Sequence, residues 1–369
     1  MRKSFDEIFD DRTKYGTKIK TDEYKEHGNH IIIDQGQEQI AGYTDFEDGL
    51  LEEVPAIIFG DHTRVIKYVD KPFFLGADGV KVLRSKYEDA NYKYLYYALK
   101  NANIPNTGYN RHFKWLKEIE IEYPKMNEQA AIVDIMDRAS DIISARQQQL
   151  QKLDELIKAR FVEMFGDPLI NSYGLDIKPM TEVCEIIDGD RGKNYPTVEE
   201  LFAEGYCLFL NAKNVTASGF NFDNCMFISK EKDEALRKGK LLRGDVVLTT
   251  RGTLGNLAFY TEEIPYEHVR INSGMVILRM KREIVDEVYF IEQFRMQLDD
   301  IKTKIASGSA QPQLPISTMN KIQVPIPDIE VQKQFAIFVR QVDKSKAAVQ
   351  AALNKTQLLF DSLMQKYFG

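Results

Sequence analysis

The chain has 369 residues, of which 43% are apolar and 28% are charged, and its formal net charge at pH 7 is −7. This length predicts two or more hydrophobic cores, and the composition is ordinary for a soluble globular protein. No apolar run approaches the roughly 18 residues that a membrane span needs. The acidic total argues mildly against a nucleic acid partner, although net charge does not say what one face of a protein binds.

The N-terminal segment and the cysteines indicate a cytoplasmic protein. The start, MRKSFDEIFDDR, has no apolar stretch after its basic residues, so we expect no signal peptide. Cys184, Cys207 and Cys225 form no CxxC pair and leave an odd number, which suits a reducing compartment.

We expect residues 1–125 to form the first globular part of the chain. It contains GNHIIIDQGQEQIAG (Gly28–Gly42), DGVKVLR (Asp78–Arg84), an aromatic segment from Tyr92, and the short strand EIEIEYP. A polar turn and a helix of about 35 residues follow, and we assign residues 126–166 to this first helical spacer.

Residues 167–327 repeat this plan and lead into a second helical spacer at 328–369. A shift of 203 positions aligns Tyr109–Gly166 with Pro312–Gly369 without a gap, with ten identities in 58 positions. Both copies show a short strand, a proline, a polar turn and a long helix.

The upstream segments repeat more loosely. GYCLFLNAKNVTASG (Gly205–Gly219) matches the earlier GNHIIIDQGQEQIAG, and SGMVILR (Ser273–Arg279) matches DGVKVLR. Two units of about 200 residues are too few and too large for a solenoid, so the chain is a duplication.

Both predicted helices carry apolar residues at spacings of three, four and seven, as coiled coils do. The apolar seam is Ile143, Leu150, Leu153, Ile157 and Met164 in the first helix, and Val342, Val349, Leu353, Phe360, Leu363 and Tyr367 in the second. Neither helix has a partner next to it in sequence, so we expect an antiparallel coiled coil between them and a pseudo-two-fold arrangement of the duplicated parts. The alternative is that each helix packs on its own globular part as an ordinary amphipathic helix.

Both helices end on Phe-Gly, at Phe165-Gly166 and at Phe368-Gly369. We expect the aromatic ring to close the seam where the helix tip meets the opposite globular part. The glycine then ends the helix in a left-handed conformation.

No pattern in the sequence indicates catalysis. The five histidines are scattered, without HExxH or a Cys/His cluster, so we expect no metal site. The chain has no GxSxG elbow, no glycine-rich cofactor loop and no amino-methylation motif, and GDRGKNYPT (Gly189–Thr197) lacks the spacing of a phosphate loop. These features indicate a binding protein without a cofactor of its own.

In the second globular part, polar and cationic side chains gather in the loops that end the predicted strands. The candidates for DNA binding are Arg191, Lys193, Asn211, Lys213, Asn214, Arg251, Thr253, Asn256, Gln311 and Gln313. Arg pairs bidentately with guanine and Asn or Gln with adenine in the major groove, while Lys and hydroxyl groups anchor phosphates.

The first globular part offers a similar set: Gln35, Gln37, Gln39, Arg64, Tyr109, Asn110, Arg111 and Lys114. Any one of these residues could instead hold its own turn by hydrogen bonds. Their occurrence at corresponding places in both parts favours a nucleic-acid surface.

Several motifs together resemble the DNA-specificity subunit of type I restriction–modification systems, over essentially the whole chain. They are TTRGTLGN, GSAQPQLPIS, the PxxxxQ turn (Pro124–Gln129 and Pro327–Gln332) and LDELIKARFVEMFGD. The resemblance implies an α+β fold with two α/β target-recognition domains, each reading one half of a split double-stranded DNA site. Two helices in an antiparallel coiled coil would join them.

The same resemblance implies a subunit without catalysis of its own. It would dock two methyltransferase subunits and, through these, ATP-dependent restriction subunits, so that S-adenosylmethionine and ATP with Mg belong to the partners. The first globular part departs from the pattern, because FGDHTRVIKYVD (Phe59–Asp70) offers only Arg64 where the second has TTRGTLGN.

Two other classes stay open at this point. One is a duplicated adaptor whose coiled coil spaces two protein-binding domains, and the other is a methyltransferase or nuclease without a recognisable motif. An affinity for duplex DNA that falls steeply with salt would distinguish a DNA reader from an adaptor.

Overall fold

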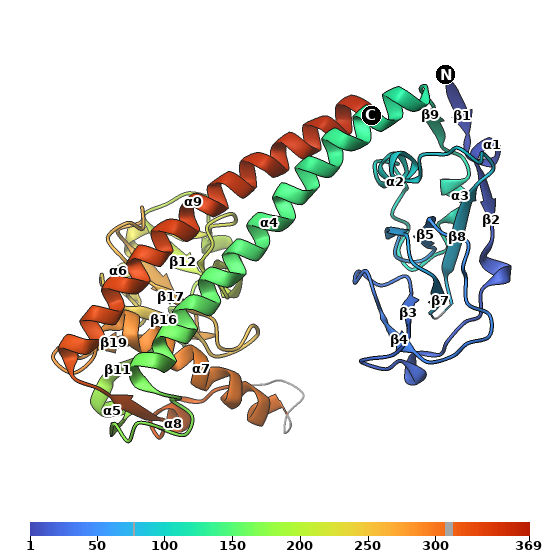
Figure 1. Cartoon of the computed structure of the whole chain (residues 1–369). Coiled ribbons are helices and arrows are strands. Elements are labelled where there is room, and N and C mark those ends of the chain that lie inside the picture. The colour runs from blue at the N-terminus through green and yellow to red at the C-terminus, as the bar shows by residue number, and fades with distance from the viewer. Residues whose placement is uncertain (77, 307–312) are drawn as a thin grey trace. The chain divides into compact units, whose positions relative to one another are not determined.

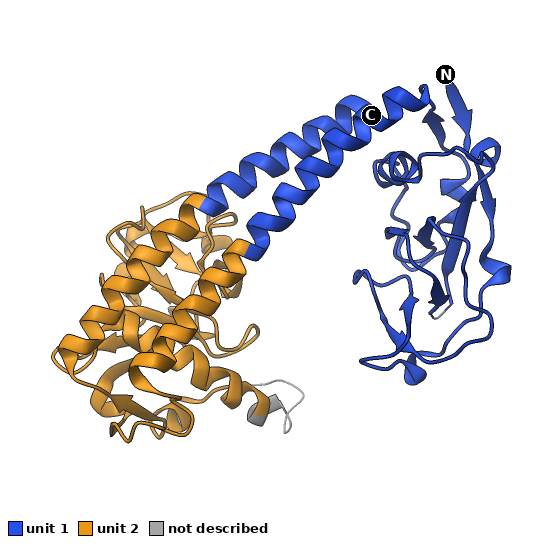
Figure 2. Ribbon diagram, in the orientation of Figure 1, with its two compact units in different colours: residues 1–148, 349–369 blue, residues 149–348 orange. Residues whose placement is uncertain are grey.

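The computed structural model describes residues 1–76, 78–306 and 313–369. The chain forms two compact units (Figure 2): unit 1 comprises residues 1–148 and 349–369, and unit 2 comprises residues 149–348. Each unit therefore contains one globular part and a portion of each of two long helices.

Unit 1 builds its globular part from short strands and helices (Figure 1). In chain order these are β1 (Arg2–Ser4), α1 (Phe5–Ile8), β2 (Phe9–Asp11), η1 (Thr13–Tyr15), η2 (Thr21–Glu23), β3 (His30–Ile33), β4 (Gly42–Thr44), β5 (Ala56–Gly60), β6 (Ile66–Val69), β7 (Phe73–Leu75), β8 (Val80–Ser85), α2 (Tyr92–Lys100), α3 (Phe113–Leu116) and β9 (Glu120–Glu122), followed by the long helix α4 (Met126–Phe165). A four-stranded antiparallel sheet has the order β2-β8-β5-β6, a three-stranded sheet has the order β4-β3-β7, and β1 pairs with β9.

Unit 2 follows the same plan. Its elements are β10 (Asp176–Pro179), α5 (Met180–Val183), β11 (Cys184–Asp188), η3 (Val198–Glu200), β12 (Cys207–Leu210), η4 (Ala212–Asn214), β13 (Val215–Thr216), β14 (Gly219–Phe220), β15 (Phe227–Ile228), α6 (Lys230–Ala235), β16 (Val246–Thr249), β17 (Leu257–Phe259), β18 (Val269–Ile271), β19 (Met275–Met280), α7 (Glu287–Ala306), α8 (Ile316–Met319) and β20 (Gln323–Ile326), followed by the long helix α9 (Ile329–Phe368). Its sheets have the orders β11-β19-β16-β17 and β15-β12-β18, and β10 pairs with β20.

The two strand orders correspond one to one, which confirms the duplication predicted from the sequence. Each three-stranded sheet contains one parallel pair, β3 with β7 and β12 with β18. Unit 2 adds the small β13–β14 pair and the helix α6 to the shared plan.

Both four-stranded sheets are covered by hydrophobic cores on their two faces, as the alternation of side chains along a strand requires. In β5, Ile57 and Phe59 join one core cluster and Ile58 joins the other. In β16, Val246 and Leu248 contact one cluster and Val247 the other. A sheet buried on both faces gives fixed strand ends, from which the intervening loops can present polar side chains.

The long helices α4 and α9 pack against each other within each unit, and their pairing is antiparallel, as predicted. In unit 1, Met136 and Ala139 of α4 share a cluster with Phe360 and Met364 of α9. In unit 2 the later part of α4 meets the earlier part of α9, where Lys346 Nζ lies 2.6 Å from an Asp154 carboxylate oxygen.

The helices also pack on the globular cores, as the alternative interpretation of an ordinary amphipathic helix predicted. Ile157 and Phe161 of α4 belong to the core cluster of unit 2 that includes Val276 and Leu278 of β19. Each helix therefore serves both the seam and a globular core.

The Phe-Gly ends make the same contact twice. The Phe165 ring lies 4.9 Å from the ring of Tyr289, and the Phe368 ring lies 5.2 Å from the ring of Tyr94. These tyrosines are the third residues of α7 and α2. Gly166 adopts the predicted left-handed conformation, with φ of 78°.

The tyrosines fix the same strand in both units. The hydroxyl of Tyr289 donates to the carbonyl of Pro325 at 2.8 Å, and that of Tyr94 donates to the carbonyl of Glu122 at 2.7 Å. Burial raises the pKa of Tyr94 to about 12 and also raises the pKa of Tyr289, so both phenols stay protonated and able to donate.

The glutamine of each PxxxxQ turn ties the start of a long helix to the strand before it. Gln332 donates to the carbonyl of Pro327 at 2.8 Å, and Gln129 donates to the carbonyl of Pro124 at 2.9 Å. Both side chains are fully buried. The motif is therefore a structural device at the strand–helix junction.

None of the described helices is both long enough and apolar enough to cross a membrane. The three cysteines are free thiols, with Cys184 and Cys207 buried.

The aromatic junction gives a test of the core. Replacing Phe165, which is 2% exposed and contacts Phe161, Tyr289 and Phe335, by Ala should lower the free energy of unfolding of unit 2 by about 3–5 kcal/mol. Hydrogen exchange of the β19 amides, which lie in the same core, measures this loss. The control is Leu156→Ala on the same helix, where the side chain is 47% exposed and the expected change is within about 0.5 kcal/mol. Equal effects of the two variants would contradict the role given to the junction.

Candidate nucleic-acid interface

In unit 2, three of the predicted DNA-binding residues line one hollow at the ends of the strands. Arg191, Arg251 and Gln313 surround it together with Asp188 and Thr250, and its volume is about 240 Å³. Arg191, Arg251 and Gln313 are exposed, so this rim presents guanidinium and amide groups to the surroundings.

The loop that carries Arg251 is built by hydrogen bonds from the end of β16. The hydroxyl of Thr249 donates to the carbonyl of Thr253 and accepts from the N–H of Asn256 at 2.9 Å. The hydroxyl of Thr250 donates to the carbonyl of Gly274 at 3.0 Å. Gly252 has a φ of 73°, which a residue with a side chain rarely adopts. The loop therefore holds its shape and leaves the side chains of Arg251 and Thr253 exposed.

Arg191 is placed by neighbours from two other segments. Its Nη2 lies 3.2 Å from Oδ1 of Asp188 and donates to the carbonyl of Ser273, also at 3.2 Å. These contacts hold the guanidinium at the rim while half of its side chain stays exposed.

Arg237 is a cation of this region that the sequence did not suggest. Its Nη2 donates to the carbonyl of Arg191 at 3.5 Å, and its backbone N–H donates to the buried Asp190 carboxylate at 2.5 Å. Burial alone would raise the pKa of Asp190, but hydrogen bonds from the backbone N–H groups of Arg237, Arg191 and Lys238, together with the Arg237 charge, outweigh it and hold the pKa below its usual value. The basic run RKGK at 237–240 is the sequence feature that could have indicated Arg237 as a candidate.

Several predicted contacts of unit 2 instead hold their own loops. Asn214 is 1% exposed, and its amide donates to the carbonyls of Asn221 and Asn224 at 3.0 and 3.1 Å. Asn211 accepts from the N–H of Lys213, and Asn256 donates to the carbonyl of Val215. Asn214 therefore has a structural role in its loop. The prediction that it contacts DNA is corrected, because its side chain is buried.

The other candidates of unit 2 are either exposed or outside the described residues. Lys193, Lys213 and Thr253 are exposed on their loops. Gln311 lies outside the described residues.

In unit 1, Gln35 connects two loops at the strand ends. Its Nε2 donates to the carbonyl of Asp78 at 2.9 Å, and its Oε1 accepts from the N–H of His62 at 3.2 Å. The His62 ring in turn stacks on the exposed Tyr109, with 4.7 Å between centroids and 8° between planes.

Asp78, whose carbonyl accepts from Gln35, also has a paired carboxylate. The carboxylate of Asp78 accepts from Lys18 Nζ at 2.6 Å, and this bond, with a smaller effect of the Arg111 charge, holds the pKa of Asp78 below its usual value. Arg111 itself is exposed. Gln35 and Tyr109 are thus predicted residues that the structure connects through His62, whereas Arg111 affects Asp78 only through its charge.

Of the remaining candidates of unit 1, some donate hydrogen bonds to backbone carbonyls of the unit and others are exposed. Arg64 donates to the carbonyl of Ile104 at 3.1 Å, Gln39 to that of Tyr68 at 2.7 Å and Asn110 to that of Thr107 at 2.5 Å. Gln37 and Lys114 are exposed, and Lys114 Nζ lies 4.1 Å from the centroid of the Trp115 ring.

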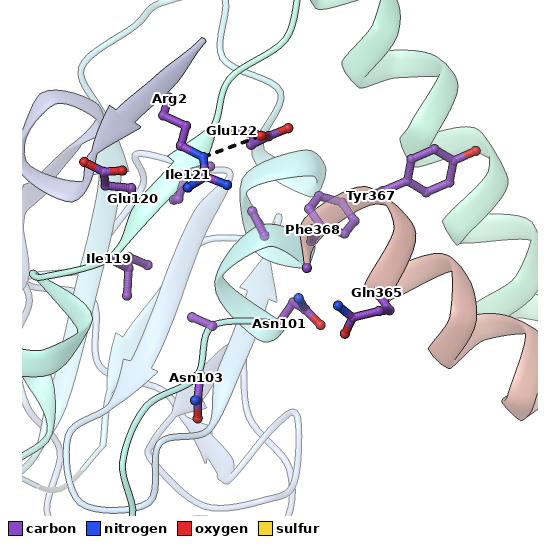
Figure 3. A pocket seen from close by; sticks show the side chains of 13 residues that line it. Arg2, Asn101, Asn103, Ile119, Glu120, Ile121, Glu122, Gln365, Tyr367 and Phe368 are labelled. Carbon is purple, nitrogen blue, oxygen red and sulfur yellow. Dashed lines mark ion pairs between the residues drawn. The ribbon is translucent and has the colours of Figure 1, made fainter.

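A larger hollow of unit 1, of about 440 Å³, lies where the end of α9 meets α2 and β9 (Figure 3). Glu120 and Glu122 stand on one wall, with Arg2 Nε 3.5 Å from a Glu122 oxygen, and Phe368 lies near α2. Two carboxylates repel phosphate, so we do not assign this hollow to DNA.

The described residues contain no group of three or more His, Cys, Asp or Glu side chains placed to hold a metal ion. The polar rims of the two units, at the hollow with Arg251 and at the His62–Tyr109 stack, can bind by hydrogen bonding, charge and ring stacking.

Comparison with known proteins gives consistent matches along the whole chain. The family described as "Type I restriction modification DNA specificity domain" matches residues 2–155 and 174–356. A curated relative from Mycoplasma genitalium, "Putative type I specificity subunit S.MgeORF438P", is 22% identical over 385 residues, covering 100% of this chain and 93% of the relative.

Solved structures share the fold. The crystal structure of a type I restriction–modification S subunit from M. genitalium matches with a TM-score of 0.62 and 20% identity, covering 100% of this chain and 96% of the other. A chain from a structural study of complex assembly and conformational transition of the type I R-M system matches with a TM-score of 0.54 and 16% identity, covering 100% and 97%. Since the family match covers most of its residues, this chain belongs to the type I restriction–modification DNA specificity family.

Proposed function

We propose that the chain is the sequence-specific DNA-binding subunit of a type I restriction–modification complex. Each unit would read one half of a bipartite double-stranded site, with an unspecified gap between the halves. The observation that carries this proposal is the rim of Arg191, Arg251 and Gln313 around one hollow at the strand ends of unit 2.

The chemistry of this rim suits base recognition. Arg251 has a guanidinium fork that matches the two acceptors of guanine in the major groove, and an amide such as Gln313 matches adenine. Exposed Lys193 and Lys213 would contact phosphates, which position a protein on the duplex without reading its sequence.

We propose that the two target-recognition domains span residues 1–125 and 167–327. The helical spacers would then be residues 126–166 and 328–369, which include α4 and α9. This division follows the function of each part, whereas the compact units divide both helices near their middles.

The partners in this proposal are two methyltransferase subunits and, through them, restriction subunits. The chain would have no catalysis and no cofactor of its own, with S-adenosylmethionine and ATP with Mg bound by the partners. Partner cations would neutralise most phosphates, which accounts for a DNA reader with a net charge of −7. It would act in the cytoplasm, where its DNA substrate lies.

A mobility-shift titration tests the function. The full chain, together with methyltransferase subunits, is titrated against random duplex at several salt concentrations, with the methyltransferase subunits alone as control. We expect the chain to add affinity whose logarithm falls linearly with the logarithm of the salt concentration, because bound phosphates release counterions. If the chain adds no affinity for duplex at any salt concentration, the proposal is wrong and a protein-binding adaptor replaces it.

Replacing Arg251 by Ala tests the reading rim. Loss of a bidentate contact should weaken binding by roughly 1–3 kcal/mol and relax one base position in one half-site only. Methylome sequencing of cells that carry the variant system reports the motif. The control is Arg138→Ala on α4, an exposed arginine paired with Asp134, which should leave the motif unchanged. An unchanged motif and normal methylation in the Arg251 variant would mean that Arg251 has only a structural role.

A further inference from the structure

We infer that His62, not Arg64, is the specificity-determining residue of unit 1 at the position that Arg251 holds in unit 2. This inference rests on the proposed function and adds that the two half-sites are read by different chemistry: a guanidinium in unit 2 and a stacked His–Tyr pair in unit 1.

The strand registers fix this equivalence. In unit 1, β5 pairs with β8 so that Ile57 faces Leu83 and Gly60 faces Val80. In unit 2, β16 pairs with β19 so that Val246 faces Leu278 and Thr249 faces Met275. The strands β8 and β19 are the matching segments DGVKVLR and SGMVILR, which makes Gly60 the counterpart of Thr249.

Backbone hydrogen bonds carry the equivalence one residue further. The N–H of Asp61 donates to the carbonyl of Gly79 at 2.6 Å, and the N–H of Thr250 donates to the carbonyl of Gly274 at 2.8 Å. Asp61 and Thr250 therefore correspond, and the residues that follow them are His62 and Arg251.

The same two residues also receive matching bonds from the other side. The carbonyl of Asp61 accepts from the N–H of His112 at 2.8 Å, and that of Thr250 accepts from the N–H of Leu314 at 3.1 Å. Arg111 and Gln313, both exposed, directly precede these two donors. In unit 2, Arg251 and Gln313 line the same hollow, and in unit 1 Arg111 directly precedes the residue that donates to the carbonyl next to His62.

Arg64 cannot fill the place of Arg251. The loop of unit 1 is shorter, with residues 61–65 between its strands where unit 2 has residues 250–256. Arg64 adopts a φ of 61°, and its guanidinium donates to the Ile104 carbonyl instead of extending from the loop.

The surroundings of His62 fit a side chain that contacts a ligand. Gln35 holds its backbone N–H, and the 86%-exposed Tyr109 covers one face of its ring. Nδ1 of His62 is buried without a hydrogen-bond partner among the described residues, so no protein group fixes the ring through that atom. Unlike a guanidinium fork, an imidazole donates or accepts through single nitrogens, and it adds a flat face that suits stacking against a base or a thymine methyl group.

The experiment selects bound sequences from random duplexes with the full chain and its methyltransferase subunits. We expect His62→Ala to reduce discrimination about tenfold or more at one position of one half-site, and this half-site is the one that Arg251→Ala leaves unchanged. His62→Arg should move the preference at that position towards guanine. His62→Gln, which keeps a polar side chain, is a second variant for the case that the Ala variant does not fold. Thermal denaturation measures whether each His62 variant is folded.

Arg64→Ala is the matched control, expected to lower thermal stability and to leave the selected motif unchanged. The inference fails if folded His62 variants select the same motif as the unchanged protein, or if Arg64→Ala alters the motif. A bipartite motif in the unchanged protein that is insensitive to His62 overturns only this inference, whereas the absence of any selected motif overturns the proposed function.

Discussion

The packing of a terminal phenylalanine on a buried tyrosine is the contact on which each unit depends. Helix α4 begins in unit 1 and ends with Phe165 in the core of unit 2, while α9 begins in unit 2 and ends with Phe368 against the core of unit 1. Each core is thus completed by a helix that starts in the other unit. Because the tyrosine hydroxyls also hold β9 and β20, the same contact ties the helices to the strands. Loss of the buried Phe165 ring leaves a cavity, and loss of either ring disturbs a strand–helix junction.

This shared frame separates what must stay the same from what can differ between the units. Both units share the main strand orders, the ring contact and hydroxyl bond of the buried tyrosine, and the bond from the turn glutamine to its proline carbonyl. The loops at the strand ends differ: one carries Arg251 with a hollow beside it, and the other carries His62 stacked on Tyr109. A fixed frame with variable loops suits a protein whose two halves read different sequences, since function resides in sites placed on a fold.

Much of the fold could be predicted because it repeats and because its apolar residues follow helical and strand periods. The antiparallel helices, the left-handed Gly166 and the matching segments of β8 and β19 all followed from local patterns. The candidate site was harder to predict from the sequence, because the type of a residue does not tell whether its side chain points inward from a loop or outward to solvent. Asn214, Asn256 and Arg64 have the chemistry of base contacts but are used by their own loops. His62 could not be predicted from the sequence, because its equivalence with Arg251 appears only in the strand register, across loops of different length.

The central claim is that each unit contacts one half of a split site on duplex DNA. Chemical footprinting of a duplex that carries the selected site, bound by the chain with its methyltransferase subunits, tests it most directly. Two blocks of protected guanine and adenine edges, separated by base pairs whose edges stay reactive, are the result that this account predicts. The Arg251→Ala variant should remove protection within one block only. A single continuous block, or protection that the chain does not add to that of the methyltransferase subunits alone, would contradict it.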